Sequence, residues 1–423
     1  MQIKAPKGCR DIYGVEAGQL QYLERVYYDL AKKFGFQEIR VPTFEQTELF
    51  QRGVGETTDI VNKEMYTFED KGGRSMTLRP EGTAPVVRAY LEHGMANLPS
   101  PLKLFYSMNV FRYERPQKGR YREFQQFGME LIGASGALAE AEILSFLDSF
   151  FKKLGLVDYQ LALNSLGCNA CRSAYNEKLK DYLVEHSSEL CPDCVGRSQR
   201  NPLRCLDCKN PNCAPVLNSA PLPADLLCSD CQAEFTKLLA ALDQLGINYY
   251  LAPRLVRGLD YYTGTVFEFQ SDKLGAQTAI LGGGRYDKLI AELGGEPTPA
   301  VGYAFGVERL RLELEAGGLL PEFQPRADLS IVSFADTGVE ALVLANNLRA
   351  AGLVVDCDLM GRSFKAQMKQ ANRQGARYLL VLGTDELQAE EVEIKRLSDG
   401  STAMVLKSEI TKYIKQSEEA NGR

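Results

Sequence analysis

The stretch Phe111-Arg-Tyr-Glu-Arg-Pro-Gln-Lys-Gly-Arg-Tyr-Arg-Glu-Phe124 places five basic residues within eleven positions. Pro116 and Gly119 interrupt it, so we expect a loop between two strands, at 102–114 and 122–132. Such a loop suits polyanions, because the guanidinium fork binds phosphate through two hydrogen bonds. A solvated charged hairpin has the same composition, and from composition alone both interpretations stay open.

The composition of the whole chain is typical of a globular protein. Its 423 residues are 45% apolar and 25% charged, and this length predicts about two or three domains. With 49 basic and 55 acidic side chains the net charge is −6, so nucleic acid could bind only through local basic patches. The start of the chain has no apolar signal-peptide core, and no apolar run reaches the ~18 residues of a membrane span, so we expect a cytoplasmic protein with no membrane partner. The two histidines, His93 and His186, argue against a Ser–His–Asp triad and a histidine-rich catalytic zinc site.

Three further motifs could line a ligand pocket. Leu255-Val-Arg-Gly-Leu-Asp-Tyr-Tyr-Thr-Gly264 sets an arginine beside paired tyrosines, and Leu281-Gly-Gly-Gly-Arg-Tyr-Asp287 permits close approach of the backbone to a ligand. Leu78-Arg-Pro-Glu-Gly-Thr-Ala84 offers a glutamate and a threonine to a small polar ligand. Arg309, near the start of a helix, is placed to bind an anion. The ordinary alternatives are a strand end that packs its aromatic side chains, a glycine turn, and a capped turn before an apolar helix at 84–91.

Nine of the eleven cysteines lie between 165 and 232, and we expect an inserted, mainly helical subdomain at about 170–245. Repeated Cys-x-x-Cys pairs are the ligand pattern of structural zinc, and unligated reduced thiols are the open alternative. One tetrahedral site takes four thiolates, so we expect a single site that uses two pairs and matters for the subdomain alone. The candidate ligands are Cys191, Cys194, Cys205, Cys208, Cys213, Cys228 and Cys231. The pair Cys168/Cys171 is the one least expected to take part.

Beyond a linker at 317–327, strands and helices alternate, which predicts a small α/β domain with a mostly parallel sheet. The expected elements are strands at 329–333, 354–358 and 378–382, helices at 337–351 and 363–374, a hairpin, and a last helix at 408–416. Five cations at steps of three or four would form one helix face: Arg362, Lys365, Lys369, Arg373 and Arg377. A basic stripe on an acidic protein is a candidate nucleic-acid surface, and a solvated helix face is the alternative.

In this order, the segments closely resemble the histidyl-tRNA synthetase family of class II aminoacyl-tRNA synthetases. The resemblance runs from Lys7-Gly-Cys-Arg-Asp-Ile12 to the C-terminal domain. The regions 111–130 and 299–314 resemble class II motifs 2 and 3, and Phe36–Phe44 resembles motif 1, which implies a homodimer. Arg257–Gly264 and Gly283–Asp287 resemble the two stretches specific to the histidine enzyme.

The resemblance implies an α/β multidomain fold. It consists of a catalytic domain at 1–325, with an antiparallel six-stranded sheet, flanking helices and the inserted subdomain, and an anticodon-binding α/β domain at 327–423. The implied activity is that of a histidine–tRNA ligase, which uses ATP with Mg²⁺ to activate L-histidine and then charges tRNA(His). A rival resemblance is to a non-catalytic histidine-binding regulatory subunit of ATP phosphoribosyltransferase. Such paralogues usually lack the anticodon domain and have eroded motif 2 and Arg257 positions.

Residue roles also follow from the resemblance. The implied catalytic residues are Arg257, Arg112 and Arg309. The implied ATP-binding residues are Arg112, Glu114, Arg120, Phe124 and Arg309, and the implied histidine-binding residues are Glu81, Thr83, Gln126, Glu130, Tyr261, Tyr262 and Tyr286. The implied tRNA-binding residues are Arg115, Gln117, Lys118, Lys365, Lys369 and Arg373. One departure from the family pattern is Gln125, where the family usually has histidine. It leaves open how the surroundings of the neighbouring Gln126, the position expected to contact the substrate, are adjusted.

Overall fold

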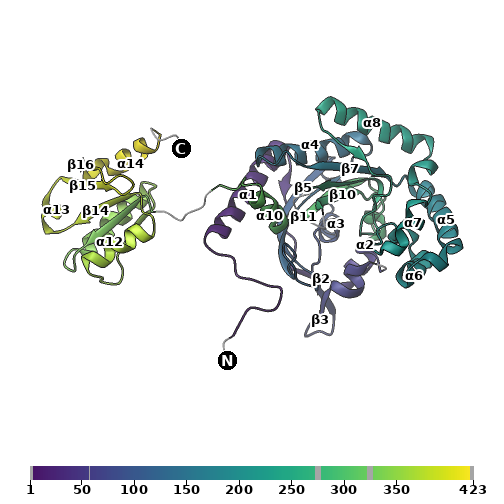
Figure 1. The fold of residues 1–423 in the computed structure, drawn as a ribbon, viewed down its shortest axis with the longest axis horizontal. Coiled ribbons are helices and arrows are strands. Elements are labelled where there is room, and N and C mark those ends of the chain that lie inside the picture. Colours follow the sequence, from purple (N-terminus) through teal and green to yellow (C-terminus); the bar gives the residue numbers. More distant parts are fainter. Residues whose placement is uncertain (1–2, 57, 272–277, 322–326, 420–423) are drawn as a thin grey trace. The chain divides into compact units, whose positions relative to one another are not determined.

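The computed structural model describes residues 3–56, 58–271, 278–321 and 327–419. They form two compact units, a larger one dominated by Gln19–Pro321 and a smaller one dominated by the chain beyond residue 321, to which the short segment Tyr13–Gly18 is also assigned (Figure 1). No helix in these described ranges combines the length and the apolar character that a membrane crossing requires.

The larger unit is built on one eight-stranded sheet with the order β1-β5-β6-β11-β10-β9-β7-β8. Its six central strands, β5 to β7 in this order, pair with one another only in antiparallel fashion, which confirms the sheet implied by the family resemblance. The structure adds a two-residue parallel strand at each edge. The bounds are β1 Gln37–Glu38, β5 Leu102–Phe111, β6 Glu123–Ile132, β7 Gln160–Ser165, β8 Tyr250–Leu251, β9 Thr263–Gln270, β10 Ala279–Arg285 and β11 Ala300–Gly306.

Three helices cover one face of this sheet with a continuous apolar core: α1 (Val15–Lys33), α4 (Ala137–Lys153) and α10 (Val307–Ala316). Strand alternation supplies the sheet side of this core, because Phe127, Met129 and Leu131 of β6 point into it. Tyr27 of α1 stacks on Phe127 with 4.4 Å between ring centroids. The residues between these on β6 therefore face the opposite side of the sheet, where polar groups gather.

On that opposite side, α3 (Thr83–Glu92) and α9 (Leu289–Glu292) pack against the ends of the central strands through a separate small core. The helix α2 (Thr47–Val54) contacts both of them. A separate three-stranded sheet has the order β2-β4-β3, and α2 directly follows its first strand in the sequence. The strands are β2 Phe44–Gln46, β3 Tyr66–Glu69 and β4 Ser75–Leu78.

The chain between β7 and β8 is helical and contains no strand; all of it lies within the described ranges. Its α-helices are α5 Asn169–Glu185, α6 Pro192–Arg200, α7 Ala214–Asn218 and α8 Ser229–Leu245. Short 3₁₀ turns join them. Because α8 packs along α4 through Leu238 and Leu242, the insertion is anchored to the helical face of the main sheet.

The smaller unit has a five-stranded sheet in the order β13-β12-β14-β15-β16. The first three strands are parallel and the last two form an antiparallel hairpin, which confirms the predicted α/β domain. The strands are β12 Leu329–Ser333, β13 Val355–Cys357, β14 Tyr378–Leu382, β15 Glu391–Arg396 and β16 Thr402–Leu406. The helices are α11 Gly338–Ala350, α12 Phe364–Arg373, α13 Thr384–Gln388 and α14 Ile410–Glu419.

Candidate active site

A cavity of about 700 Å³ is bounded by β6, β9, β10 and β11 of the larger unit. The implied catalytic, histidine-binding and ATP-binding residues that line it are Glu81, Thr83, Arg112, Glu114, Arg120, Phe124, Gln126, Arg257, Tyr261, Tyr262 and Arg309. The two others, Glu130 and Tyr286, are buried directly behind Thr83. The structure therefore brings together residues from both halves of the larger unit's sequence.

Glu130, on β6, is a fully buried acid at the edge of this cavity. Its carboxylate accepts hydrogen bonds from the hydroxyls of Thr83 (2.8 Å), Tyr106 (3.2 Å) and Tyr286 (2.5 Å). Gly302 on the neighbouring strand is required here, since a Cβ at that position would lie 1.9 Å from a carboxylate oxygen of Glu130. Burial raises the pKa of Glu130 to about 8. A cation brought beside this acid would favour its ionised form.

Glu81 combines two roles that the sequence left as alternatives. Its carboxylate oxygens accept hydrogen bonds from the backbone N–H groups of Thr83 (2.9 Å) and Ala84 (2.7 Å), which confirms a capped turn at the start of α3. The same side chain lines the cavity. Burial raises the pKa of Glu81, and the two backbone hydrogen bonds oppose that shift. A helix cap of this kind fixes the carboxylate in one orientation toward a ligand.

Two adjacent glutamines on β6 point to opposite sides of the sheet. Gln126 lines the cavity, and its buried carbonyl oxygen Oε1 has no hydrogen-bond partner within the described protein. A ligand with a donor group would satisfy this atom. Gln125 instead donates through Nε2 to the hydroxyl of Ser107 (2.9 Å) and to Glu24. Gln125, the departure from the family pattern, therefore faces the side of the sheet that α1 covers and does not line the cavity.

Arg257 is held in place by an acid that the sequence analysis missed. Its Nη1 donates to the carboxylate of Glu268, and Gln270 donates to the same carboxylate at 2.7 Å. Gly282 of β10 makes room for the guanidinium, because a Cβ there would lie 2.1 Å from the Cζ of Arg257. The alternation of β9 could have indicated Glu268, since it is the one charged residue in Thr265–Phe269.

The loop between β5 and β6 contributes cations to the same cavity. The guanidinium of Arg112 lies 5.6 Å from the centroid of the Phe124 ring, and Arg120 donates to Glu114 at 3.1 Å. Arg309, at the start of α10, is partly desolvated; burial lowers its pKa, and the positive charge of Arg120 acts in the same direction. Several guanidinium groups in one cavity favour an anionic ligand. The loop residues Arg115, Gln117 and Lys118 are exposed and do not line the cavity.

The basic stripe of the smaller unit is shorter than predicted. Because α12 spans Phe364–Arg373, Arg362 and Arg377 lie beyond its ends, where they pair with Asp358 (2.9 Å) and with Asp328. The prediction of five cations on one helix face is thus wrong for these two, since spacing alone does not show which acids fold against them. The exposed cations on α12 are Lys365, Lys369 and Arg373.

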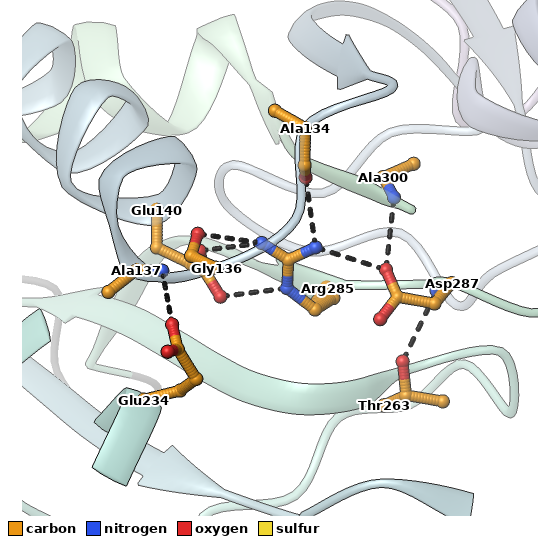
Figure 2. Close-up of polar contacts among 9 residues, drawn as sticks. All are labelled: Ala134, Gly136, Ala137, Glu140, Glu234, Thr263, Arg285, Asp287 and Ala300. Atoms are coloured by element: carbon orange, nitrogen blue, oxygen red, sulfur yellow. Dashed lines mark hydrogen bonds and ion pairs between the residues drawn. The ribbon is translucent and has the colours of Figure 1, made fainter. Parts of the chain in front are cut away.

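Arg285, at the end of β10, is the centre of a buried ion-pair network (Figure 2). It donates to both carboxylate oxygens of Glu140 on α4 (2.8 and 2.6 Å) and to Asp287 (3.1 Å). Asp287 also accepts a hydrogen bond from the backbone N–H of Ala300 (3.0 Å), so the network joins α4, β10 and β11 (Figure 2). It fixes the turn that carries Tyr286, whose hydroxyl binds the buried acid of β6.

The cysteines form two groups of four rather than one. Site A consists of Cys168, Cys171, Cys228 and Cys231, and site B consists of Cys191, Cys194, Cys208 and Cys213. This arrangement differs from the single group expected from the sequence and includes Cys168 and Cys171, the pair least expected to take part, because the fold brings the end of β7 next to the start of α8. Cys205 belongs to neither group, and its Sγ lies 3.4 Å from the carbonyl oxygen of Cys194.

Comparison with known proteins relates this site to one family. A family model described as Histidyl-tRNA synthetase matches residues 8–310, and one described as Anticodon binding domain matches residues 330–417. The curated histidine–tRNA ligase of Acetivibrio thermocellus is 50% identical, over 95% of this chain and 96% of its own. That of Caldanaerobacter subterraneus is 49% identical, over 98% of this chain and all of its own.

Comparison with solved structures points to the same family as the sequence relatives. The crystal structure of apo histidyl-tRNA synthetase from S. aureus covers 98% of this chain and 100% of its own, with a TM-score of 0.84 and 38% sequence identity. The match extends over both units, including the C-terminal α/β domain. The chain belongs to the histidyl-tRNA synthetase family of class II aminoacyl-tRNA synthetases.

Proposed function

We propose that this family member is an active histidine–tRNA ligase. It uses ATP to convert L-histidine to histidyl-adenylate and pyrophosphate, and it then transfers the histidyl group to the 3′ end of tRNA(His). One observation carries the proposal: the cavity holds Arg112, Arg257 and Arg309 together with the acid Glu81 and the unpartnered amide oxygen of Gln126. Such a cavity suits a triphosphate and a small zwitterion at once.

The histidine end of the site is polar and buried. Gln126 accepts a hydrogen bond from the α-ammonium group, and the nearby Glu130 becomes ionised when that cation binds. Glu81 and the hydroxyl of Tyr261 or Tyr262 pair with the two imidazole nitrogens. A buried site of this kind rejects an isostere that lacks those groups by ~10⁴-fold or more, because its own polar groups would lose their partners.

The phosphate end needs positioning and charge neutralisation more than a protein base. The histidine carboxylate attacks the α-phosphorus in line, and pyrophosphate leaves. Arg257 and Arg112 bind the α-phosphate, Arg309 binds the γ-phosphate, and Phe124 stacks on the adenine. Charge that develops on the α-phosphate is stabilised by guanidinium groups already fixed in place, as in an oxyanion hole.

The residues at this end also fit a magnesium ion. Glu64 and Glu114 both line the cavity. Burial chiefly raises the pKa of Glu64, and the negative charge of Glu114 acts in the same direction. Mg²⁺ prefers carboxylate and phosphate oxygens, and we assign these two acids as the residues that would hold it. A bound Mg²⁺ would neutralise negative charge on the phosphates of ATP.

The remaining assignments concern tRNA and assembly. Arg115, Gln117 and Lys118 contact the acceptor end of the tRNA, and Lys365, Lys369 and Arg373 contact its anticodon region. The segment Phe36–Phe44 forms the interface of a homodimer. The protein acts in the cytoplasm.

Histidine-dependent exchange of radioactive pyrophosphate into ATP tests the proposal directly. We expect exchange with L-histidine and not with other amino acids, followed by charging of tRNA(His). Histidine binding by calorimetry without any exchange would overturn the proposal and would instead support a histidine-binding regulatory protein.

A further inference from the structure

We propose that site A and site B each bind one Zn²⁺ through four thiolates, and that site A fixes the loop behind the histidine pocket. The first part stands on the cysteine geometry alone. The second part rests on the proposed function, because it assigns Asp260–Tyr262 to the histidine pocket. The two parts are tested by different measurements.

The sulfur positions match a tetrahedral metal site. In each group the four Sγ atoms all lie within 4.8 Å of one another. The Sγ–Sγ distances are 3.6 Å for Cys168–Cys171, 4.0 Å for Cys171–Cys231 and 3.9 Å for Cys191–Cys208. Zn–S bonds of about 2.3 Å in tetrahedral geometry place sulfurs about 3.8 Å apart. A disulfide requires about 2 Å, so these sulfurs are arranged around a common centre and not in bonded pairs.

The backbone around the sulfurs favours the ionised thiolates that a metal needs. In site A, the N–H of Cys168 points to the Sγ of Cys231 and the N–H of Cys228 to the Sγ of Cys171, each at 3.1 Å. In site B, the N–H of Cys191 points to the Sγ of Cys213 at 3.2 Å. Hydrogen bonds of this kind to ligand atoms are the usual outer shell of a metal site.

The N-terminal ends of three helices also favour ionised thiolates. Each of three Cys-x-x-Cys pairs straddles the first turn of a helix, with Cys168 before α5, Cys191 before α6 and Cys228 before α8. The positive end of a helix dipole stabilises a thiolate. The donor set contains only sulfur, which is the ligand type of structural zinc.

Site A joins the two ends of the insertion to the catalytic sheet. Cys168 follows β7, and Cys228 precedes α8. The residue after Cys171 is Arg172, whose half-buried guanidinium donates to the backbone carbonyls of Tyr262 (2.7 Å) and Asp260 (3.0 Å). A metal that fixes the first turn of α5 therefore fixes the backbone of the tyrosine pair that lines the cavity. On this proposal the cysteines matter for the histidine pocket as well, and not, as the sequence led us to expect, for the insertion alone.

Site B organises a different edge of the cavity. Between Cys194 and Cys213, the side chains of Arg204, Asp207 and Lys209 line the same cavity. Loss of site B should therefore disturb the rim contributed by the insertion and the hydrogen bond from Asn201 to the side chain of Asp260 (2.8 Å). Arg172 would keep its contacts with the backbone carbonyls of the tyrosine loop.

Metal content is the first test and needs no activity. Elemental analysis of the full chain, purified without chelator, should find two zinc per chain. Cys171→Ser with Cys231→Ser should leave one, as should Cys194→Ser with Cys208→Ser. The matched control, Cys205→Ser with Cys357→Ser, should keep two. One zinc or fewer in the unmodified protein, or iron in its place, would overturn the proposal.

A measurement on the unmodified protein guards against variants that fail to fold. Exchange of the metal for Co²⁺ should give two equivalents with the intense visible absorption and the thiolate charge-transfer bands of tetrahedral thiolate coordination. Absence of those bands with Co²⁺ bound would contradict cysteine ligation.

The link to the histidine pocket is tested by kinetics. In pyrophosphate exchange, Arg172→Ala and the site A pair should each raise the KM for histidine by ~10-fold, with a smaller change in the KM for ATP. The site B pair should leave the histidine KM within about twofold. Equal effects of the two pairs on histidine KM would overturn the link, whereas loss of all exchange in the unmodified protein would count against the proposed function alone.

Discussion

The guanidinium of Arg257, in the loop before β9, is paired with the carboxylate of Glu268 on β9, and both side chains line the cavity. The pair holds the arginine in one position before any substrate arrives. Its Nε is buried and has no hydrogen-bond partner within the described protein. A preorganised cation with an unused donor is suited to charge that appears only in the transition state.

Arg257→Ala should therefore lower the rate of adenylation much more than the affinity for histidine. The loss of one such donor is worth ~10²–10³-fold in rate. Pyrophosphate exchange gives the rate, and calorimetry gives the histidine affinity. A suitable control is Arg74→Ala, since Arg74 is also paired with an acid, Asp70, but is exposed on the surface. Equal losses of rate and affinity would count against a role in the transition state.

Much of the smaller unit could be predicted from local pattern. The strands β12 and β14 have the predicted bounds, because short, mainly apolar runs flanked by polar turns have few alternative structures. The helix α13 was not predicted, since the five residues Thr384–Gln388 show no helical period. Where helix ends meet acids from other segments, as at Arg377 and Asp328, the sequence spacing carried no information.

The site depended on pairings that no local pattern contains. Strand β11 lies between β6 and β10, which places Gly302 beside Glu130 and Gly283 beside Tyr303. The roles of these glycines follow only from that register. The family resemblance supplied the residues of the cavity, but Arg172 contacts backbone 90 residues away in sequence, and Glu268 pairs with an arginine outside its own strand. Those contacts appear only in three dimensions.

Glu130 should make the stability of the ligand-free protein depend on pH. In the folded state its pKa is raised from 4.5 to about 8, so the folded protein keeps a proton that the unfolded chain loses between these values. The free energy of unfolding should therefore fall as pH rises through this window, by up to ~1.4 kcal/mol per pH unit, and level off above it. Urea unfolding of the unmodified protein and Glu130→Gln, from about pH 5 to 9, measures the difference. Parallel pH profiles would contradict the raised pKa.

The network around Arg285 predicts a large effect on stability. Glu140→Ala leaves the Arg285 guanidinium buried without its main partner, and breaking a buried pair costs ~3–5 kcal/mol. The matched control is Glu142→Ala on the same helix, whose partner Lys103 is partly exposed; the side-chain exposures are 35% and 25%, against 5% and 7% for Glu140 and Arg285. That surface pair contributes ~1 kcal/mol or less. Thermal or urea unfolding compares the two variants, and similar losses would show that the network is not a tight ion pair.

Reversing charge on α12 should separate tRNA binding from amino-acid activation. Lys365→Glu with Arg373→Glu places two acids on an exposed helix face, which would repel the phosphate backbone and raise the KM for tRNA in aminoacylation. Histidine-dependent pyrophosphate exchange should be unchanged, because that reaction takes place without tRNA. Lys395→Glu with Lys412→Glu makes the same change in net charge elsewhere in the smaller unit and serves as the control. If both double variants raise the tRNA KM equally, the effect is one of overall charge, and if neither does, α12 presents an ordinary solvated face.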